Sequence, residues 1–339
     1  MNNKKLTRRR FLGNSAGVIA LCGAAHAANE VSDNAPWKFV HVTDIHVGSP
    51  RSFRFAPAWN ENWQTARQQI IACEPDLLLA GGDITRDGSI HRFELEAIKA
   101  DFDSLPFPCH VTPGNMDTGN KHTDKQGVRA NRDDLALNLS SAQLQQFEGV
   151  FGSHCWSFVH KNVRFSSFCD MVAGSGLPEE AAMWEWLERQ CDLPPVAHHV
   201  WMMHSALFTE DLHEPNYDIT DREQYLNWYF GIDEPHRSRI MSVFKETGAT
   251  LVLSGHIHCR KRHEAEGIQF HINPSTAFKQ WGKHWSDGDD SLGFVEYTVS
   301  DKGITERFVP LAKESTAKGY GPGGHPKPEE RDYSVAWEK

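Results

Sequence analysis

The alternation of short apolar segments and amphipathic segments between residues 37 and 112 constrains the fold more than any other feature of this chain. Two segments, at 57–73 and 89–105, repeat apolar side chains at helical spacing and separate three short segments that resemble buried strands. Leu77–Ala80 is apolar at every position, which is typical of a parallel strand covered on both faces. The sequence therefore predicts a βαβαβ arrangement and a mainly parallel sheet. The expected strands are Trp37–Thr43, Leu77–Ala80 and Cys109–Thr112.

Further elements are expected downstream, where two polar stretches interrupt the pattern. Residues 118–150 contain only a short helix, near 141–147, and residues 207–235 are polar with scattered aromatic residues. We interpret both stretches as insertions near the mouth of a site. The other expected elements are a hairpin of Trp156–Val159 and Val163–Phe168, a helix at 179–191, a strand at His199–Met203, a helix stopped by Gly248, and strands at Thr250–Ser254, Ile268–Ile272, Leu292–Val299 and Ile304–Val309.

Polar side chains follow most of these strands at the point where each strand ends. Open α/β sheets bind ligands at the carboxyl ends of their strands, and carboxylate and imidazole groups suit manganese, iron or zinc. Asp44 alone could cap a helix and His204 alone could be a core histidine, but five such groups in this order predict one metal site. The groups are Asp44-Ile45-His46, Gly82-Asp83, Gly114-Asn115-Met116-Asp117, His204 and Gly255-His256-Ile257-His258.

The first 27 residues have the features of an export signal and are not expected to be part of the fold. Arginines at positions 8–10 precede Phe11-Leu12 and an apolar run, and Ala25-His26-Ala27 has the small residues of a cleavage site. This pattern resembles a twin-arginine signal peptide. The apolar run is too short to span a membrane comfortably, so no stable membrane anchor is expected. We expect the twin-arginine translocase as an export partner and a periplasmic or secreted mature chain; a cytoplasmic enzyme with an uncleaved tail is the alternative.

The net charge and the spacing of the cysteines argue against two other classes of protein, general nucleic-acid-binding proteins and proteins with Cys-x-x-Cys zinc or redox motifs. The formal net charge of −10 argues against a general nucleic-acid-binding protein, which needs a basic face. Six cysteines remain after residue 27, and no pair has the Cys-x-x-Cys spacing of a zinc knuckle or a redox motif. Disulfides are permitted in an oxidising compartment, but their pairing cannot be deduced from the sequence.

The five polar groups resemble the signature of the calcineurin-like metallophosphoesterase superfamily: Asp-x-His, Gly-Asp, Gly-Asn-His-Asp/Glu, His and Gly-His-x-His. The motifs cover about residues 37–260, and Asn273–Phe278 is similar to the end of the bacterial branch that includes cyclic-nucleotide phosphodiesterase-like members. The resemblance implies an α/β fold, a four-layer αββα sandwich of two mixed sheets flanked by helices. The domain is expected to span residues 36–312, and an irregular tail rich in Gly, Pro and charge is expected at 313–339.

The resemblance also implies two metal ions (Mn, Fe or Zn) and assigns their ligands. One metal would take Asp44, His46 and His258, the other would take Asn115, His204 and His256, and Asp83 would bridge both. Two metals about 3.5–4 Å apart can clamp an in-line displacement at phosphorus and generate hydroxide at neutral pH. Asp117 and His256 are the expected catalytic residues.

Met116 departs from the family pattern, because the family usually has His at this position. That imidazole is thought to protonate the leaving oxygen, whereas a thioether is only a weak acceptor. Loss of a general acid typically costs a factor of about 10²–10⁴ in rate. Three interpretations remain open: a substrate with a good leaving group, replacement by His122 or His213, or a protein that binds metal and phosphate with little turnover.

Arg86 stands three residues after Asp83, where purple acid phosphatases have a metal-binding Tyr, and this excludes that subgroup. Arg86 either contacts phosphate as a bidentate donor or is a solvated loop arginine. Asn115 is a second candidate for substrate contact. His41 and His271 are expected to be structural, and the aromatic residues of the second insertion are expected to pack.

The expected function is an exported dinuclear-metal phosphoesterase that acts on a small phosphorylated substrate. A diester is favoured over a monoester by the branch resemblance and by the missing acid. The alternative is a catalytically silent metal-dependent protein that binds a phosphorylated ligand, and Met116 is the residue that supports this alternative.

Overall fold

The computed structural model describes residues 35–48, 58–129, 133–280 and 284–316. The expected signal peptide at 1–27, and all but the first four residues of the expected tail, lie outside the described residues. Their assignments therefore stay predictions. The first described strand begins at Trp37, next to the domain boundary that the sequence predicts.

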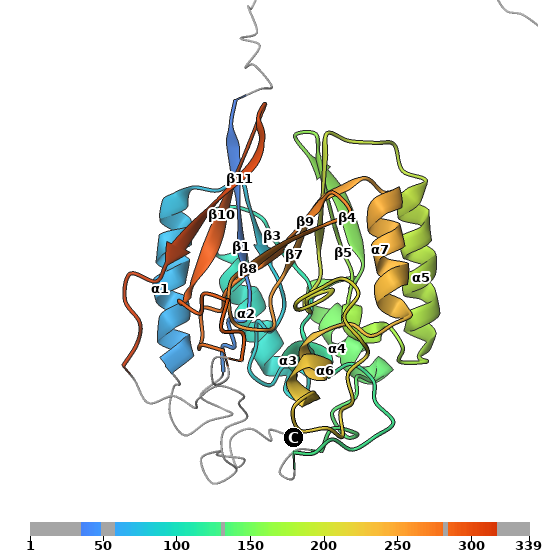
Figure 1. Cartoon of the computed structure of the whole chain (residues 1–339). Coiled ribbons are helices and arrows are strands. Elements are labelled where there is room, and N and C mark those ends of the chain that lie inside the picture. Colours follow the sequence, from blue (N-terminus) through green and yellow to red (C-terminus); the bar gives the residue numbers. More distant parts are fainter. Residues whose placement is uncertain (1–34, 49–57, 130–132, 281–283, 317–339) are drawn as a thin grey trace, which may run out of the picture. The chain divides into compact units, whose positions relative to one another are not determined.

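The first sheet has the strand order β11-β10-β1-β2-β3 (Figure 1). Its parallel half is the predicted unit, in which β1 pairs with β2 and β2 pairs with β3. The strands β10 and β11 extend the sheet antiparallel to β1, so the sheet is mixed. The strands are β1 (Trp37–Val42), β2 (Leu77–Ala80), β3 (Cys109–Val111), β10 (Gly293–Ser300) and β11 (Gly303–Pro310).

The second sheet has the strand order β4-β5-β6-β7-β9-β8. It is parallel in the middle, from β5 to β9, and has an antiparallel strand at each edge. The strands are β4 (Trp156–His160), β5 (Val163–Ser167), β6 (His198–Met202), β7 (Ala249–Ser254), β8 (Lys261–Ala265) and β9 (Ile268–Ile272). The turn between β4 and β5 places Lys161 and Asn162 at positive φ, as two-residue hairpin turns require.

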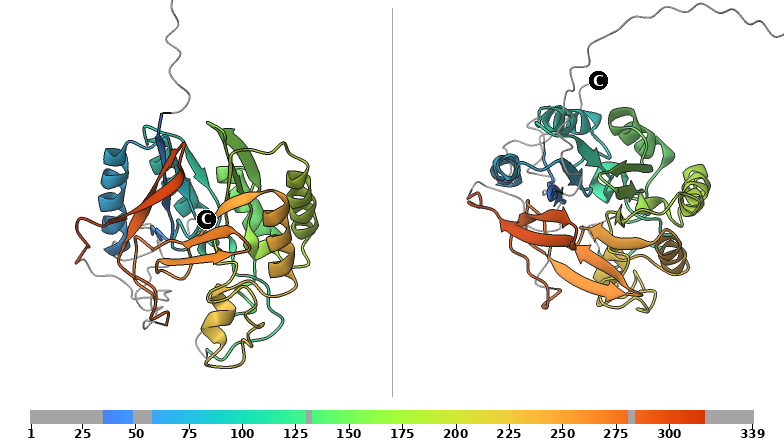
Figure 2. Two further views of the ribbon diagram at one scale, coloured as in Figure 1. Left: turned by 45° about the horizontal axis from the view of Figure 1, so that its top comes forward. Right: turned by 90° about the horizontal axis from the view of Figure 1, so that it is seen from above.

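The core is divided into layers by the two sheets. Side chains from β1, β2 and β10 pack against side chains from β5, β6 and β7 in one apolar cluster between the sheets. Two further clusters lie under the helices, which flank the sheets in Figures 1 and 2. The helices α1 (Ala58–Cys73) and α2 (Arg92–Asp103) cover the first sheet, and α5 (Pro178–Cys191) and α7 (His236–Glu246) cover the second. The predicted αββα arrangement of two mixed sheets is therefore confirmed.

Several boundaries differ from the expected ones for local reasons. The helix α2 begins at Arg92 rather than Ser89, because Asp87 accepts the amides of Ile90 and His91 in a tight turn. The helix α4 (Ser141–Phe151) is longer than expected and starts at a capping box of Ser140 and Gln143. The strand β8, the short helix η1 (Asp170–Val172) and the one-turn helices α3 (Asn115–Thr118) and α6 (Tyr225–Phe230) were not predicted.

No helix among the described residues is both long enough and apolar enough to cross a membrane. All six cysteines of the described residues have free thiols.

Candidate metal centre

The predicted ligands stand on strained backbone at the carboxyl ends of the strands. Left-handed φ is uncommon outside glycine and costs free energy, and it concentrates at functional sites. The loop after β1 is bonded to the loop after β2, since Gly82 accepts the amide of Asp44 at 3.0 Å and Asp83 accepts the amide of His46 at 2.9 Å. Five predicted ligands have positive φ: Asp44 (53°), His46 (50°), Asp83 (48°), His256 (69°) and His258 (55°).

Two glycines allow these loops to approach one another. A Cβ atom on Gly255 would overlap Thr43 Oγ1 and Asp44 Oδ2, and a Cβ atom on Gly114 would overlap the backbone nitrogen and the carboxylate of Asp83. Both positions therefore require glycine so that the loop backbones can lie against the carboxylates.

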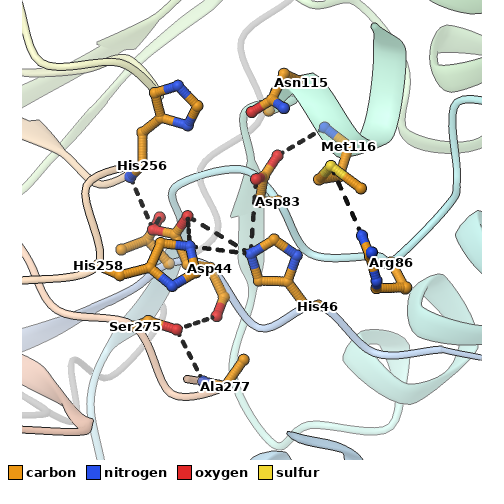
Figure 3. Close-up of polar contacts among 12 residues, drawn as sticks. Asp44, His46, Asp83, Arg86, Asn115, Met116, His256, His258, Ser275 and Ala277 are labelled. Carbon is orange, nitrogen blue, oxygen red and sulfur yellow. Dashed lines mark hydrogen bonds and ion pairs between the residues drawn. The ribbon is translucent and has the colours of Figure 1, made fainter. Parts of the chain in front are cut away.

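The first cluster contains Asp44, His46 and His258, all buried (Figure 3). His258 Nε2 lies 3.2 Å from Asp44 Oδ1 and 3.2 Å from His46 Nε2. His46 Nε2 lies 3.6 Å from Asp83 Oδ2. Asp44 Oδ1 is buried and has no hydrogen-bond partner in the described part of the chain, although two imidazole nitrogens face it. One small cation would be contacted by all of these atoms.

The second cluster contains Asp83, His204 and His256, together with Asp44, which it shares with the first cluster. His204 Nε2 lies 3.4 Å from Asp83 Oδ1 and 3.1 Å from His256 Nδ1. Asp83 thus directs one carboxylate oxygen at His46 and the other at His204. This geometry places Asp83 between the two clusters, where the resemblance predicts a bridging ligand.

Asn115 turns its oxygen towards the second cluster. Its Nδ2 donates to Asn120 Oδ1 at 3.0 Å and to the Tyr229 hydroxyl at 2.8 Å, so Oδ1 faces Asp83 and His256 Nδ1. Without a cation, the opposite orientation would be better satisfied, because the amide nitrogen would then donate to Asp83 and His256. An inward-facing oxygen among other acceptors fits a metal ion.

Partners outside the clusters set the tautomers of three histidines. A ring N–H that donates to a carbonyl leaves the lone pair of the other ring nitrogen free for a metal. In three of the histidine rings, the nitrogen that faces away from the cluster lies within hydrogen-bonding distance of a backbone carbonyl oxygen. These pairs are His204 Nδ1 with Gly81 (2.8 Å), His256 Nε2 with Tyr229 (3.2 Å) and His258 Nδ1 with Phe278 (2.7 Å).

The pKa shifts in the clusters keep the two aspartates charged and two of the histidines neutral, as a cation site requires. Burial alone would raise the pKa of Asp83, but the charge of His204 outweighs burial and lowers this pKa to about 2. The pKa of Asp44 is likewise held below its usual range by His258 against the effect of burial. Burial lowers the pKa of His46 and of His256 to about 3. For His204 the effect of burial is overcome by Asp83, which raises the pKa to about 10, so a proton occupies this position when no metal does.

Together these observations fit two metal ions. The donors are carboxylate, amide and imidazole, which suit manganese, iron or zinc. The seven side chains are Asp44, His46, Asp83, Asn115, His204, His256 and His258, and all are buried.

Asp117 is placed away from the clusters. Its carboxylate accepts the amides of Ile84, Thr85 and Gly114 and the hydroxyl of Thr85, at 2.6–3.3 Å. Burial and the charge of Asp83 raise the pKa of Asp117 to about 7, and the hydrogen bonds from Thr85 and Gly114 oppose this rise. These contacts make Asp117 a brace between the loops after β2 and β3.

Arg86 and Met116 lie together at one side of the centre (Figure 3). Arg86 Nη1 lies 3.9 Å from Met116 Sδ, and the guanidinium carbon lies 5.9 Å from the centroid of the Trp59 ring. Arg86 is only 1% exposed, so the solvated-loop interpretation of this arginine is wrong.

The two histidines considered as replacements for the missing acid are exposed. His122 lines a surface hollow with Asn216 and Asp233. The backbone amide of His213 donates to Asp211 Oδ1 at 2.8 Å. Neither side chain belongs to either cluster. His41 and His271 are structural as expected, since both join a hydrogen-bonded network with Asn273 and Tyr297 between the sheets.

Three supporting residues were missed by sequence reasoning. Asp170 accepts the amides of His204 and Ser205, Tyr229 contacts Asn115 and His256, and Ser275 Oγ donates to the carbonyl of Asp44. The Phe-Cys-Asp sequence at the end of β5 was the available signal for Asp170, because it repeats the pattern of a carboxylate after a strand. Tyr229 lies in the second insertion, where nothing in the sequence separates it from packing aromatics.

The fold and the site define a metal-binding phosphoesterase architecture, in which two buried ligand clusters lie at the strand ends of two mixed sheets. Residues 38–260 match the family model described as calcineurin-like phosphoesterase, and the chain belongs to this family of phosphoester hydrolases.

Individual proteins are similar to the chain in sequence or in fold. The chain is 24% identical over 302 residues to the serine/threonine-protein phosphatase CPPED1 of Danio rerio, covering 82% of this chain and 86% of the relative. It is 31% identical over 86 residues to a probable cyclic nucleotide phosphodiesterase of Pseudoalteromonas sp., covering 25% of this chain and 33% of the relative. The purple acid phosphatase PPD1 of yellow lupin has a similar fold, with a TM-score of 0.53 at 11% identity, over 84% of this chain and 53% of that one.

Proposed function

We propose that the protein is an exported phosphoesterase with two metal ions, and that it hydrolyses a small phosphoric ester, with a diester preferred over a monoester. The observation that carries the proposal is the position of Asp83, whose two carboxylate oxygens face His46 of the first cluster and His204 of the second. Asp44, His46 and His258 would hold one ion, and Asn115, His204 and His256 would hold the other.

Each part of the chain has a defined task in this proposal. Bound metal ions would supply an activated water and positive charge against the phosphoryl oxygens. The carbonyls of Gly81, Tyr229 and Phe278 keep three imidazoles in the tautomer that offers a lone pair to the centre. His256 thereby acts as a ligand of fixed orientation. Asn115 and Arg86 lie next to the clusters, where they could contact a phosphoryl oxygen.

The preference for a diester rests on two features. The side chain of Met116, next to Asp83, cannot donate a proton to the leaving group. A diester with an acidic leaving alcohol depends less on such a proton than an alkyl monoester does. One relative is named a phosphodiesterase and another a protein phosphatase, so the names of relatives do not decide between the two substrates.

The test is hydrolysis of bis-p-nitrophenyl phosphate and p-nitrophenyl phosphate by residues 28–339 with added manganese. We expect turnover of the diester to exceed that of the monoester. Asp83→Asn should abolish both activities and remove bound metal, which elemental analysis measures. Asp103→Asn is the matched control, because Asp103 is an exposed partner of Lys99 on α2 and should change neither quantity. A protein that binds no metal after incubation with manganese or iron would refute the proposal.

A second candidate function is favoured by Met116. A metal-loaded chain without turnover would be a binding protein for a phosphorylated ligand, since Met116 offers only a weak acceptor where a proton donor is needed. Calorimetric binding of inorganic phosphate, with no hydrolysis of either p-nitrophenyl substrate, would select this function.

Export by the twin-arginine translocase to the periplasm or beyond is a further part of the proposal. Its support is the Arg8-Arg9-Arg10-Phe11-Leu12 sequence and the small residues before Ala28. We expect a mature N-terminus at Ala28. Replacement of Arg8 and Arg9 by Lys keeps the charge and should retain the precursor in the cytoplasm, and correct export of this variant would contradict the assignment.

A further inference from the structure

The side chain of Met116 occupies a special position beside the candidate metal centre. Its backbone amide donates to Asp83 Oδ1 at 2.8 Å, so the residue directly adjoins the carboxylate proposed to bridge the metals. Its side chain is partly exposed, whereas the neighbours Asn115 and Asp117 are buried. A substrate held at the centre would therefore meet the thioether of Met116.

The polar contacts of Met116 contain no proton that can be released near neutral pH. Its carbonyl accepts the amide of Ser89, and Sδ lies against Arg86 Nη1 at 3.9 Å (Figure 3). A thioether cannot donate a proton at all, and a guanidinium does not release one, since its pKa exceeds about 12. Arg86 thus brings a permanent positive charge to this side of the centre, with no acid.

Among the described residues, Asp117, which follows Met116, and the histidines that face Asp83 are engaged elsewhere. The carboxylate of Asp117 is turned to the amides of Thr85 and Gly114. The ring nitrogens of His46 and His204 that face Asp83 are metal ligands in the proposed function.

We infer that the natural substrate releases a leaving group that is a weak base and itself negatively charged, which is the chemistry of a phosphoanhydride. This inference rests on the proposed function. The oxygen of water forms a bond to phosphorus, the bridging P–O bond breaks, and its electron pair stays on the leaving phosphate oxygen. The proton lost from water passes to solvent, so the leaving oxygen needs none.

Arg86 determines the charge of the leaving group in this inference. A guanidinium in a buried position attracts an anion more strongly than a neutral alcohol, because the surrounding dielectric is low. A leaving phosphate carries the complementary charge, whereas a leaving alcohol does not. The absence of an acid at Met116 and the positive charge of Arg86 therefore favour the same class of substrate, a phosphoanhydride.

The first experiment measures how the rate depends on the acidity of the leaving group. Methyl aryl phosphates with phenols of graded acidity are assayed with the manganese-loaded protein, beside an alkyl phosphodiester and a dialkyl diester of pyrophosphate. We expect kcat/KM to fall steeply as the phenol becomes more basic. The pyrophosphate diester should be cleaved faster than the alkyl phosphodiester by a factor of about 10²–10⁴, the contribution of a general acid.

Two variants of Met116 make the test specific. Met116→His should flatten the dependence by accelerating the substrates with basic leaving groups. Met116→Leu removes the sulfur without adding an acid and should keep the steep dependence. A shallow dependence in the unmodified protein, or equal rates for the pyrophosphate diester and the alkyl phosphodiester, would overturn the inference.

A binding measurement provides a readout that does not depend on turnover. Methylenebisphosphonate mimics an anhydride but cannot be hydrolysed, and phenylphosphonate lacks the second phosphoryl group. Calorimetry of the metal-loaded protein should give tighter binding of methylenebisphosphonate, and Arg86→Gln should reduce this advantage at unchanged metal content. Equal affinities for the two ligands would contradict the role of Arg86. A metal-loaded protein that hydrolyses none of the substrates would refute the proposed function instead.

Discussion

The carbonyl oxygen of Tyr229 lies 3.2 Å from Nε2 of His256. Tyr229 belongs to α6 in the second insertion, and the same residue contacts the Asn115 amide with its hydroxyl at 2.8 Å. The insertion is therefore part of the support of the second ligand cluster. Outer partners of this kind orient metal ligands, and their loss typically reduces metal affinity or activity by about 10–100-fold.

Tyr229→Phe should weaken metal binding at the cluster of Asn115, His204 and His256. The hydroxyl partner of the Asn115 amide is lost while the carbonyl to His256 remains, so a loss of about 10–100-fold in metal affinity is expected. Competition with a chelator measures this affinity. Tyr225→Phe is the matched control on the same helix, because the Tyr225 hydroxyl donates to Asp134. Equal metal affinities in both variants would show that the Tyr229 hydroxyl is unimportant.

Gly255→Ala should displace Asp44. The added methyl group would overlap Thr43 Oγ1 and Asp44 Oδ2, and overpacking of this kind costs about 1–3 kcal/mol. We expect reduced metal content and a lower free energy of unfolding, measured by elemental analysis and by denaturant titration. Gly149→Ala is the control: it adds the same group within α4, where only the flexible end of Arg92 is close, and should keep full metal content. Full occupancy in Gly255→Ala would contradict the packing argument.

Asp117→Asn separates a structural role from a catalytic one. The carboxylate accepts four hydrogen bonds that brace the loops after β2 and β3. Replacing it by an amide should lower the free energy of unfolding by about 1–3 kcal/mol, because both carboxylate oxygens accept hydrogen bonds and an amide nitrogen cannot, so buried donors are left without an acceptor. The metal content of the folded fraction should persist. A variant with unchanged stability and metal content but greatly reduced kcat would instead establish Asp117 as catalytic.

Metal binding should release a proton from His204 at neutral pH. The neighbouring Asp83 raises the pKa of His204 to about 10 against the effect of burial, so the metal-free protein holds this proton from pH 7 to 9. The pKa of His46 and of His256 is about 3, so these rings are already neutral there. Metal affinity should therefore increase about tenfold per pH unit until the pH reaches the pKa of His204.

Calorimetry in buffers with different ionisation enthalpies counts the released protons. His199→Gln should leave the count unchanged, because burial lowers the pKa of His199 to about 4 and its ring lies in β6 away from the clusters. Metal affinity that does not vary between pH 6 and 9 would rule out a proton on His204.

All strands except β8, most helices and all seven proposed ligands could be predicted from the sequence. Short apolar segments determine buried strands because few other structures bury four successive apolar residues, and parallel strands bring their carboxyl ends to one edge. Asp44 and Asp83, which follow β1 and β2 of one sheet, are therefore placed together by local pattern alone, whereas His204 follows β6 of the second sheet and reaches them only through the packing of the two sheets. The family membership follows from the same motifs, since Gly255-His256-Ile257-His258 and its partners have a fixed order in the chain.

Other features were decided only by the tertiary structure. The buried position of Arg86 and the carbonyl partners of His204, His256 and His258 depend on groups that are remote in the sequence. Asp117 follows Met116 directly, yet its carboxylate is turned to Thr85 and Gly114. The physical reason is that residue type and local spacing determine which groups follow a strand, whereas the direction of a side chain is set by the partner that packing brings to it.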